Sequence, residues 1–280
     1  MEIDKLSPVL FVDASYYVFY RFYATLRWYG FRHANDDEDE SLKVLQNVTE
    51  KADFIEAFVK HITQDIKKWR NEWKIKNGNI FFCFDCSRQD IWRNKYHNNY
   101  KGTRVHANTF DSNIFPQFYE WFDKNHKNFG IEPLSVNNLE ADDVVYLSVQ
   151  KVLSLDDEIN VVIITNDNDY LQMRNERIKI VNAQGHDLVK RSIGTPEQDL
   201  IYKIILGDVS DNIPSICKRM GHITAKRLAL STKEERDQWI SKKGKECEDA
   251  YKYNERLISF QYIPEEYCEI WRNKYEWKCI

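Results

Sequence analysis

The chain has 280 residues, with 40 Lys and Arg against 44 Asp and Glu and a formal net charge of −4. Hydrophobic residues make up 42% and aromatic residues 14%, which excludes a disordered or low-complexity protein and is enough to bury a sizeable core. The longest apolar runs, Tyr16–Tyr20 and Ile80–Phe84, are five residues, whereas a membrane-spanning helix needs about 20. We therefore expect a soluble, intracellular protein of the cytoplasm, nucleoid or nucleus, with no membrane partner.

Short β-branched and aromatic runs alternate with longer amphipathic segments along the chain. The predicted strands are Val9–Val12, Ile80–Asp85, Glu132–Val136, Val161–Thr165 and Ile178–Asn182. Apolar residues at three-to-four spacing from Ile55 to Trp73 predict a long helix, and two more are predicted at Leu139–Leu153 and Pro196–Leu206. This alternation predicts an α/β fold with a central, mostly parallel sheet flanked by helices. After Leu206 the predicted strands stop, and helices and turns follow.

The six cysteines are too few and too scattered to indicate a disulfide framework in a chain of this size. Cys83 and Cys86 have C-x-x-C spacing, but Cys83 belongs to a predicted strand, where side chains three positions apart point to opposite faces. No second C-x-x-C pair completes a zinc site. We therefore expect buried or free thiols here.

Carboxylates gather where predicted strands end. Asp13 closes the first strand and Asp85 the second. Asp167 and Asp169 follow the apolar strand at Val161–Thr165. Because the carboxyl ends of parallel strands lie along one edge of a sheet, three strands deliver carboxylates to the same edge.

Two further acidic groups stand beside helices or turns. Glu140, Asp142 and Asp143 open a predicted helix, whose N-terminal dipole tolerates negative charge. Asp208 and Asp211 are three residues apart, so a helical turn places them side by side. Together these groups predict one site with nine carboxylates: Asp13, Asp85, Glu140, Asp142, Asp143, Asp167, Asp169, Asp208 and Asp211.

A cluster of this size cannot stay ionised without cations, because like charges raise each other's pKa. Oxygen ligands favour Mg²⁺ or Mn²⁺ over zinc. Two divalent ions about 3.5–4 Å apart are the usual arrangement for in-line attack on a phosphodiester. The carboxylates therefore predict a site for two Mg²⁺ ions, which Mn²⁺ can replace. Taken singly, each acidic group is as well explained as a helix cap or a dipole partner.

At these residues the chain resembles the 5′-nuclease (flap endonuclease) family with a PIN-like core, especially its bacterial, phage and viral members. The matching segments are Leu10–Ser15, Phe82–Asp85, Tyr100–Arg104, Glu140–Val144, Ile163–Asp169 and Gly207–Pro214. They occur in the family's order across residues 8–230. The resemblance implies a PIN-like nuclease core over residues 1–206 with an arch at residues 86–130. It also implies a helical duplex-binding region over residues 207–280, with a helix-turn-helix element at residues 207–230.

The resemblance implies a metal-dependent, structure-specific 5′ nuclease. Such a hydrolase cleaves ester bonds in DNA or RNA–DNA hybrids at 5′ flaps, nicks or single-strand–duplex junctions, as a 5′-3′ exodeoxyribonuclease or flap endonuclease in replication or repair. The implied ligands of the first ion are Asp13, Asp85, Glu140 and Asp142. Those of the second ion are Asp142, Asp167, Asp169 and Asp211, with Asp143 and Asp208 in the outer shell. Two alternatives stay open: a PIN-like endoribonuclease, and a non-catalytic nucleic-acid-binding protein on the same fold.

Basic and aromatic residues interleave between Arg88 and Arg104, a pattern that suits phosphate steering and base stacking on a single strand. A solvated basic helix face is the alternative. In the family this stretch enters the arch, and the resemblance assigns Arg93 and Lys101 to the scissile phosphate, so that both are catalytic candidates beside Asp142. The other nucleic-acid contacts expected here are Arg88, Lys95, Tyr100 and Arg104.

The stretch that follows Ile213 matches the family's helix-turn-helix element, which grips duplex backbone and often binds K⁺. Its nucleic-acid-binding candidates are Lys218, Arg219, Gly221 and Lys226. This chain has fewer glycines here than the family, which means fewer close backbone–phosphate approaches. Duplex binding through Lys218 and Arg219 is therefore expected in preference to a well-formed K⁺ site.

Overall fold

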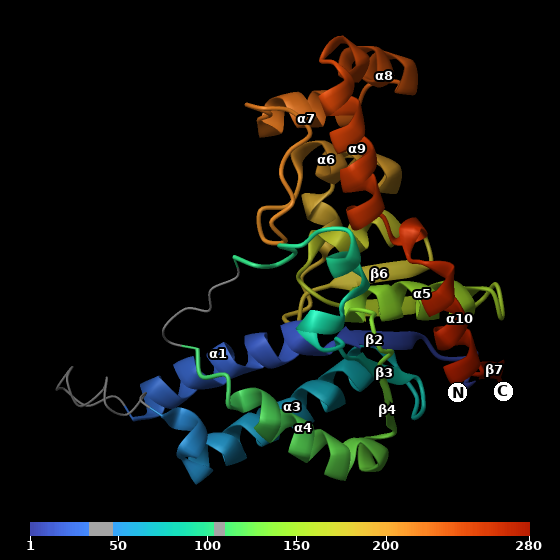
Figure 1. Cartoon of the computed structure of the whole chain (residues 1–280). Coiled ribbons are helices and arrows are strands. Elements are labelled where there is room, and N and C mark those ends of the chain that lie inside the picture. The colour runs from blue at the N-terminus through green and yellow to red at the C-terminus, as the bar shows by residue number, and fades with distance from the viewer. Residues whose placement is uncertain (34–46, 104–109) are drawn as a thin grey trace.

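The computed structural model describes residues 1–33, 47–103 and 110–280. Across these ranges five parallel strands form one sheet in the order β4-β3-β2-β5-β6 (Figure 1). Their bounds are β2 Val9–Asp13, β3 Ile80–Cys83, β4 Ile131–Leu134, β5 Val161–Ile164 and β6 Ile178–Val181. All five predicted strands are present, with ends that differ by one or two residues, and the predicted α/β fold with a parallel sheet is confirmed. No helix in the described ranges is long and apolar enough to span a membrane.

Helices cover both faces of the sheet (Figure 1). One face carries α1 (Ala14–Arg32), α3 (Ala52–Trp73) and α4 (Ile114–Asn125), and the other carries α5 (Ala141–Leu153) and α10 (Glu265–Lys274). Successive strand residues point to opposite faces, so Leu10 packs in the first core and Phe11 in the second. Short 3₁₀ helices lie at η1 Val48–Glu50, η2 Arg88–Asp90, η3 Trp92–Lys95, η4 His126–Phe129, η5 Asn168–Met173, η6 Leu188–Arg191 and η7 Phe260–Tyr262.

A second group of helices stands over the carboxyl edge of the sheet, at the top of Figure 1. It consists of α6 Pro196–Leu206, α7 His222–Ala229, α8 Lys233–Lys242 and α9 Lys245–Ile258. Thr195 and Gln198 form a capping box that starts α6, with Pro196 at its first position. A small core that includes Ile205, Ile216 and Leu228 holds the group together. The predicted C-terminal helical region is therefore present.

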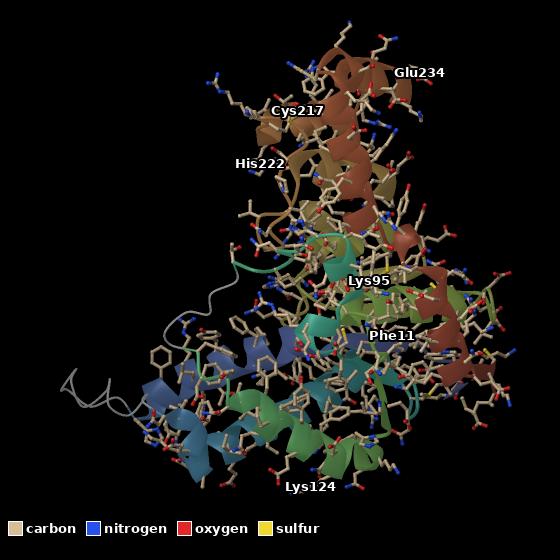
Figure 2. All side chains as sticks on the ribbon, in the orientation of Figure 1. Phe11, Lys95, Lys124, Cys217, His222 and Glu234 are labelled. Carbon is tan, nitrogen blue, oxygen red and sulfur yellow. A yellow bond between two sulfur atoms is a disulfide. The ribbon has the colours of Figure 1, made fainter. Side chains whose placement is uncertain are left out.

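Two cysteines of this helical group form a disulfide, contrary to the expectation from their spacing. Cys217, labelled in Figure 2, precedes α7 and is bonded to Cys247 of α9. The two residues are 30 positions apart in sequence, a separation that carries no pairing signal. Cys83, Cys86, Cys268 and Cys279 are free thiols.

The end of the chain returns to the sheet. Phe260, Trp271 and Trp277 lie in the same core as Phe11. The short strand β7 (Lys278–Cys279) pairs in parallel with β1 (Glu2–Ile3), so one strand does follow Leu206. The helix α6 shares its core with α7 rather than with the sheet. The division of the chain at residue 206 stays a prediction, and the packing crosses it in both directions.

Candidate metal and nucleic-acid site

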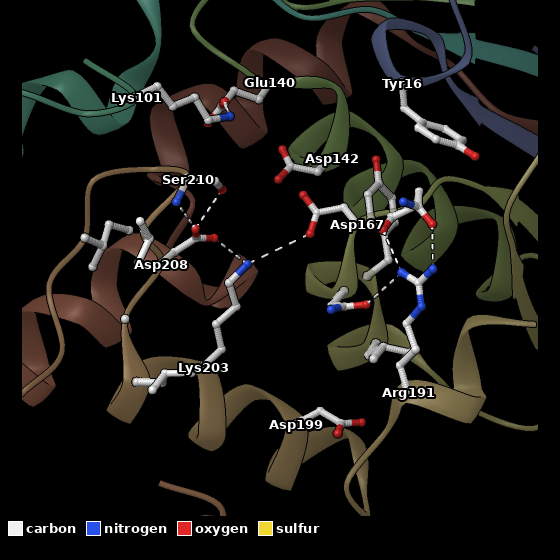
Figure 3. Close-up of a pocket in the computed structure, with 18 of the residues that line it drawn as sticks. Tyr16, Lys101, Glu140, Asp142, Asp167, Arg191, Asp199, Lys203, Asp208 and Ser210 are labelled. Atoms are coloured by element: carbon white, nitrogen blue, oxygen red, sulfur yellow. Dashed lines mark hydrogen bonds and ion pairs between the residues drawn. The ribbon is translucent and has the colours of Figure 1, made fainter. Parts of the chain in front are cut away.

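A cleft of about 1190 Å³ lies at the carboxyl edge of the sheet, between the strand ends and the α6–α7 region (Figure 3). The ends of three strands reach it: Asp13 closes β2, Asp85 follows β3, and Asp167 follows β5. Glu140 and Asp142 enter it from the start of α5. Six of the nine predicted carboxylates line this cleft: Asp13, Asp85, Glu140, Asp142, Asp167 and Asp208. The topology of the parallel sheet therefore brings the strand-end acids together as expected.

Gly207 shapes the rim of the cleft. It ends α6 with a φ of 75°, a left-handed conformation that side chains rarely adopt. A Cβ atom at this position would lie 2.4 Å from the carbonyl oxygen of Ile213. Only glycine lets the loop that carries Asp208 fold back so closely.

Within the described residues, the hydrogen bonds that three of the lining carboxylates accept all come from uncharged donors. Asp13 Oδ1 accepts from Tyr16 N at 3.1 Å, which caps α1. Asp85 accepts from Ser15 Oγ at 2.5 Å and from Ala141 N at 2.8 Å. Asp142 Oδ1 accepts from Asp143 N at 2.7 Å. We refer to Asp13, Asp85 and Asp142 as the Asp13 carboxylates.

The Asp13 carboxylates are electrostatically unfavourable when no cation is present. Burial, followed by the charge of Asp85, raises the pKa of Asp13 to about 7. Burial and the neighbouring Asp143 raise the pKa of Asp142 well above its ordinary value. The donor set is made of oxygen atoms, which suits a hard divalent ion. The residues present therefore fit the divalent cation predicted from the sequence.

Arg93 lies behind the cleft. Its Nη1 donates to Glu140 Oε2 at 2.7 Å, and its Nη2 to Asp143 Oδ1 at 2.8 Å. Its Nε donates to the carbonyl of Leu257 at 2.8 Å, and the side chain is 2% exposed. The expected contact of Arg93 with the scissile phosphate does not fit this geometry, because every guanidinium nitrogen already has a buried partner. The sequence shows that position 93 carries a positively charged side chain, but it does not show the direction in which that side chain points.

Asp143 is fully buried and faces Arg93 rather than the cleft. It also accepts from Trp92 Nε1 at 2.9 Å. With Glu140 it forms the capping box of α5, in which each side chain bonds the backbone of the other. Oxygen atoms of Glu140, Asp142 and Asp143 lie within 4.8 Å of one another, so Asp143 is an outer neighbour of the cluster.

Tyr100 and Lys101 connect one wall of the cleft to Asp211. Tyr100 Oη lies 3.0 Å from Glu140 Oε2 and 2.8 Å from Asp211 Oδ2, so its single proton is shared between the two carboxylates. Tyr100 is 6% exposed, so base stacking, the role expected for it, does not fit the structure. The Lys101 ammonium pairs with Glu140, and Lys101 N donates to the carbonyl of Asp211 at 3.0 Å. Of these residues, Lys101 and Glu140 line the cleft.

Sequence reasoning missed Lys203. This α6 residue places its ammonium 2.7 Å from Asp208 and 3.9 Å from Asp167, and also in contact with Asp169 (Figure 3). Burial alone would raise the pKa of Asp208, but Lys203 and the Ser210 donors outweigh it and lower that pKa to about 2. A single lysine in a helix gives no signal in the sequence, because its partners come from other elements.

Arg191 is a second missed residue. It lies at the end of η6 and lines the cleft. Its guanidinium donates to the side chain of Asn166 at 2.8 Å and to the carbonyl of Asn166 at 3.2 Å (Figure 3). It therefore brings positive charge to the rim beside Asp167.

The other predicted nucleic-acid contacts lie on the surface. Arg88 is exposed and bonds the carbonyl of Lys101, whereas Lys95 pairs with Glu266 at 3.2 Å, away from the cleft. Lys218, Arg219 and Lys226 are exposed around Gly221, which caps α7 and has no neighbour within 4 Å of a Cβ position. Arg104 lies outside the described residues.

Comparisons with known proteins agree on one relationship. The family described as "5'-3' exonuclease, N-terminal resolvase-like domain" matches residues 8–199. The 5'-3' exonuclease of Buchnera aphidicola (Acyrthosiphon pisum) is 27% identical over 225 residues, 78% of this chain and 68% of that protein. Ribonuclease H of Enterobacteria phage T4 is 26% identical over 202 residues, 66% of each chain.

Solved structures share the fold. The phage T5 5'-exonuclease with bound zinc superposes with a TM-score of 0.60 at 15% identity, covering 95% of this chain and 97% of that one. The phage T5 flap endonuclease in a pseudo-enzyme-product complex with DNA and metal ions gives a TM-score of 0.60 at 16% identity, with the same coverage. The similarity therefore extends through the helical group and the C-terminal return to the sheet.

Proposed function

This chain belongs to the 5′-3′ exonuclease family, as its motifs indicated, and from that premise we propose that it is a divalent-metal-dependent 5′ nuclease that hydrolyses DNA at 5′ flaps or junctions. One observation carries the proposal. Carboxylates from the ends of three adjacent strands and from the start of α5 line a single cleft, together with the cations Lys101 and Lys203. Such a cleft combines oxygen ligands for hard cations with positive charge for a phosphodiester.

We assign the first ion to the Asp13 carboxylates with Glu140, and Mg²⁺ is the ion that best suits this donor set. We assign the second ion to Asp167, Asp169 and Asp208, with Asp142 shared between the two. Asp208 replaces Asp211, the ligand that the resemblance implied, because the Lys203 ammonium holds Asp208 together with Asp167 and Asp169, whereas Asp211 is bonded to Tyr100.

Side chains of the protein bind the substrate phosphate and hold the metal ligands in position. When bound, two divalent ions lower the pKa of a water molecule and offset the charge that develops on the attacked phosphate. Lys101 stands at the cleft wall, where its flexible stem lets the ammonium exchange Glu140 for a phosphate oxygen. Arg93 is a positioning residue, because it fixes Glu140 and Asp143 without reaching the cleft.

Two surfaces suit a nucleic-acid substrate. Tyr16, Phe19 and Phe115 line the cleft, where aromatic rings can stack on bases. Lys218 and Lys226 lie outside it on the α7 side, where they can hold duplex phosphates. An RNA–DNA hybrid is a second candidate substrate, because one relative is named ribonuclease H.

A cleavage assay tests the proposal. A 5′-labelled flap duplex, an RNA–DNA hybrid and single-stranded RNA are incubated with Mg²⁺ and, separately, with EDTA. We expect Mg²⁺-dependent cuts near the flap junction, and none with EDTA. Cleavage of single-stranded RNA alone would instead support an endoribonuclease. Binding of the flap duplex without cleavage of any substrate would support a non-catalytic nucleic-acid-binding protein.

A further inference from the structure

Lys203 already occupies the carboxylates that we assign to the second ion. Its side chain is 19% exposed, and its ammonium lies 2.7 Å from Asp208 Oδ2 and 3.9 Å from Asp167 Oδ1, in contact with Asp169. Figure 3 shows the ammonium reaching from α6 between Asp208 and Asp167. We refer to Asp167, Asp169 and Asp208 as the Lys203 carboxylates.

The two halves of the cleft therefore differ in charge compensation. The hydrogen bonds to the Asp13 carboxylates come from uncharged donors, namely backbone N–H groups and hydroxyls. The Lys203 carboxylates, by contrast, share one partly buried ammonium. In the first half the Lys101 ammonium pairs with Glu140 and leaves the Asp13 carboxylates themselves without an ion-paired lysine among the described residues. In the second half the Lys203 ammonium lies directly on the carboxylates that would hold the ion.

An ammonium and a divalent ion cannot share the Lys203 carboxylates. Mg²⁺ requires oxygen atoms at about 2.0–2.1 Å, in the space that the Lys203 ammonium fills. Two cations a few ångströms apart also repel each other strongly in a partly buried site. The four-carbon stem of lysine is flexible, so the ammonium can turn into the cleft without movement of α6.

We propose that Lys203 is the resident cation of the second ion site, and that a divalent ion binds there only by displacing its ammonium. This inference rests on the proposed function, because it takes the Lys203 carboxylates as ligands. It sets an order of binding in which the first ion binds at the Asp13 carboxylates and the second follows. A substrate phosphate in the cleft offers the displaced ammonium a new partner, so substrate and the second ion bind cooperatively.

The test counts Mn²⁺ ions bound to the metal-free protein by electron paramagnetic resonance, with no substrate and no turnover. We expect two classes of site in the wild-type protein, the second weaker than the first. In Lys203→Met the second site should bind Mn²⁺ about tenfold more tightly or better, because the competing charge is gone, while the first changes little. Lys203→Gln keeps a polar end and should act in the same direction.

Lys190→Met is the matched control, because Lys190 is exposed, does not line the cleft and loses the same charge. This variant should change the Mn²⁺ affinity of neither site. A 5′-phosphorylated product duplex should tighten the second site in the wild-type protein and do so less in Lys203→Met.

An unchanged or weaker second site in both Lys203 variants, with circular dichroism like that of the wild type, overturns the displacement proposal. An equal effect of product DNA on wild type and Lys203→Met also contradicts it. A wild-type protein that binds no Mn²⁺ at either site contradicts the proposed function itself, which is a separate result.

Discussion

Arg93 and Glu140 form a buried ion pair with a nitrogen–oxygen distance of 2.7 Å, in which the side chains are 2% and 3% exposed. Asp143 completes the group at 2.8 Å from the same guanidinium. The pair lies directly behind the cleft and sets the position of a predicted metal ligand. Loss of the cation therefore affects the fold as well as the site.

Arg93→Ala should lower the free energy of unfolding by about 3–5 kcal/mol, because it leaves two buried carboxylates without their cation. Urea denaturation measures this change. Arg227→Ala, which removes an exposed arginine from α7, should change it by less than about 0.5 kcal/mol. If Arg93→Ala were as stable as the wild-type protein, the structural role of the buried Arg93 side chain would be contradicted. The result would instead favour a contact between Arg93 and the scissile phosphate.

The stability of the metal-free protein should depend on the ionisation of Asp13. Its pKa is raised from 3.8 to about 7, so the folded state binds a proton more tightly than the unfolded state between these values. The Asp13 contribution to unfolding free energy therefore decreases as pH rises from 3.8 to about 7. Melting temperatures in EDTA at pH 5 and pH 8 measure this, and Asp13→Asn should lose less stability over that range. Equal losses in both proteins would contradict it.

Binding of Mg²⁺ should restore the stability that the protein loses when Asp13 ionises at higher pH. Protons and cations compete for Asp13, so the apparent affinity for Mg²⁺ should rise with pH up to about 7. Calorimetric titration of the wild-type protein at several pH values measures the affinity. A pH-independent affinity would indicate that the ion binds elsewhere.

The Cys217–Cys247 disulfide should stabilise the helical group. It closes a loop of 30 positions, for which the loop-entropy relation gives about 3–4 kcal/mol. Adding a dithiol reductant should therefore lower the melting temperature of the wild-type protein. The same reductant should leave Cys217→Ser unchanged, and a drop of similar size in that variant would show that the disulfide is not the cause.

Lys218 and Arg219 should contribute to duplex binding through phosphates. The double variant Lys218→Ala/Arg219→Ala should weaken binding to a duplex of any sequence and flatten the salt dependence by about one counterion per residue. Fluorescence anisotropy at a series of salt concentrations measures both effects. Lys242→Ala, which removes an exposed lysine from the last turn of α8, is the control. An unchanged salt slope in the double variant would place the duplex elsewhere.

The sequence predicted the parts of the site that topology determines. Asp13, Asp85 and Asp167 come together because parallel strands end along one edge, and strand ends are visible as apolar runs. The orientation of Arg93 and the buried hydroxyl of Tyr100 were not predictable in this way, since both depend on contacts with α5 and the loop at Asp211.

The remaining differences between the sequence-based predictions and the structure come from packing between residues far apart in the chain. Lys203 meets Asp167 and Asp169 only because α6 packs against the segment that follows β5. Trp271 and Trp277 return to the sheet core across a long stretch of helices, and short-range periodicity carries no signal of that contact.

The central claim is that the cleft carboxylates hold the ions that cleave the phosphodiester. Single-turnover cleavage of a 5′-flap duplex with Mg²⁺, by the wild-type protein and by Asp142→Asn, tests it most directly. We predict that Asp142→Asn cleaves about 10³-fold more slowly or not at all, because it weakens both ion sites, while its affinity for the flap duplex is retained. Cleavage by Asp142→Asn at the wild-type rate would contradict the two-ion site.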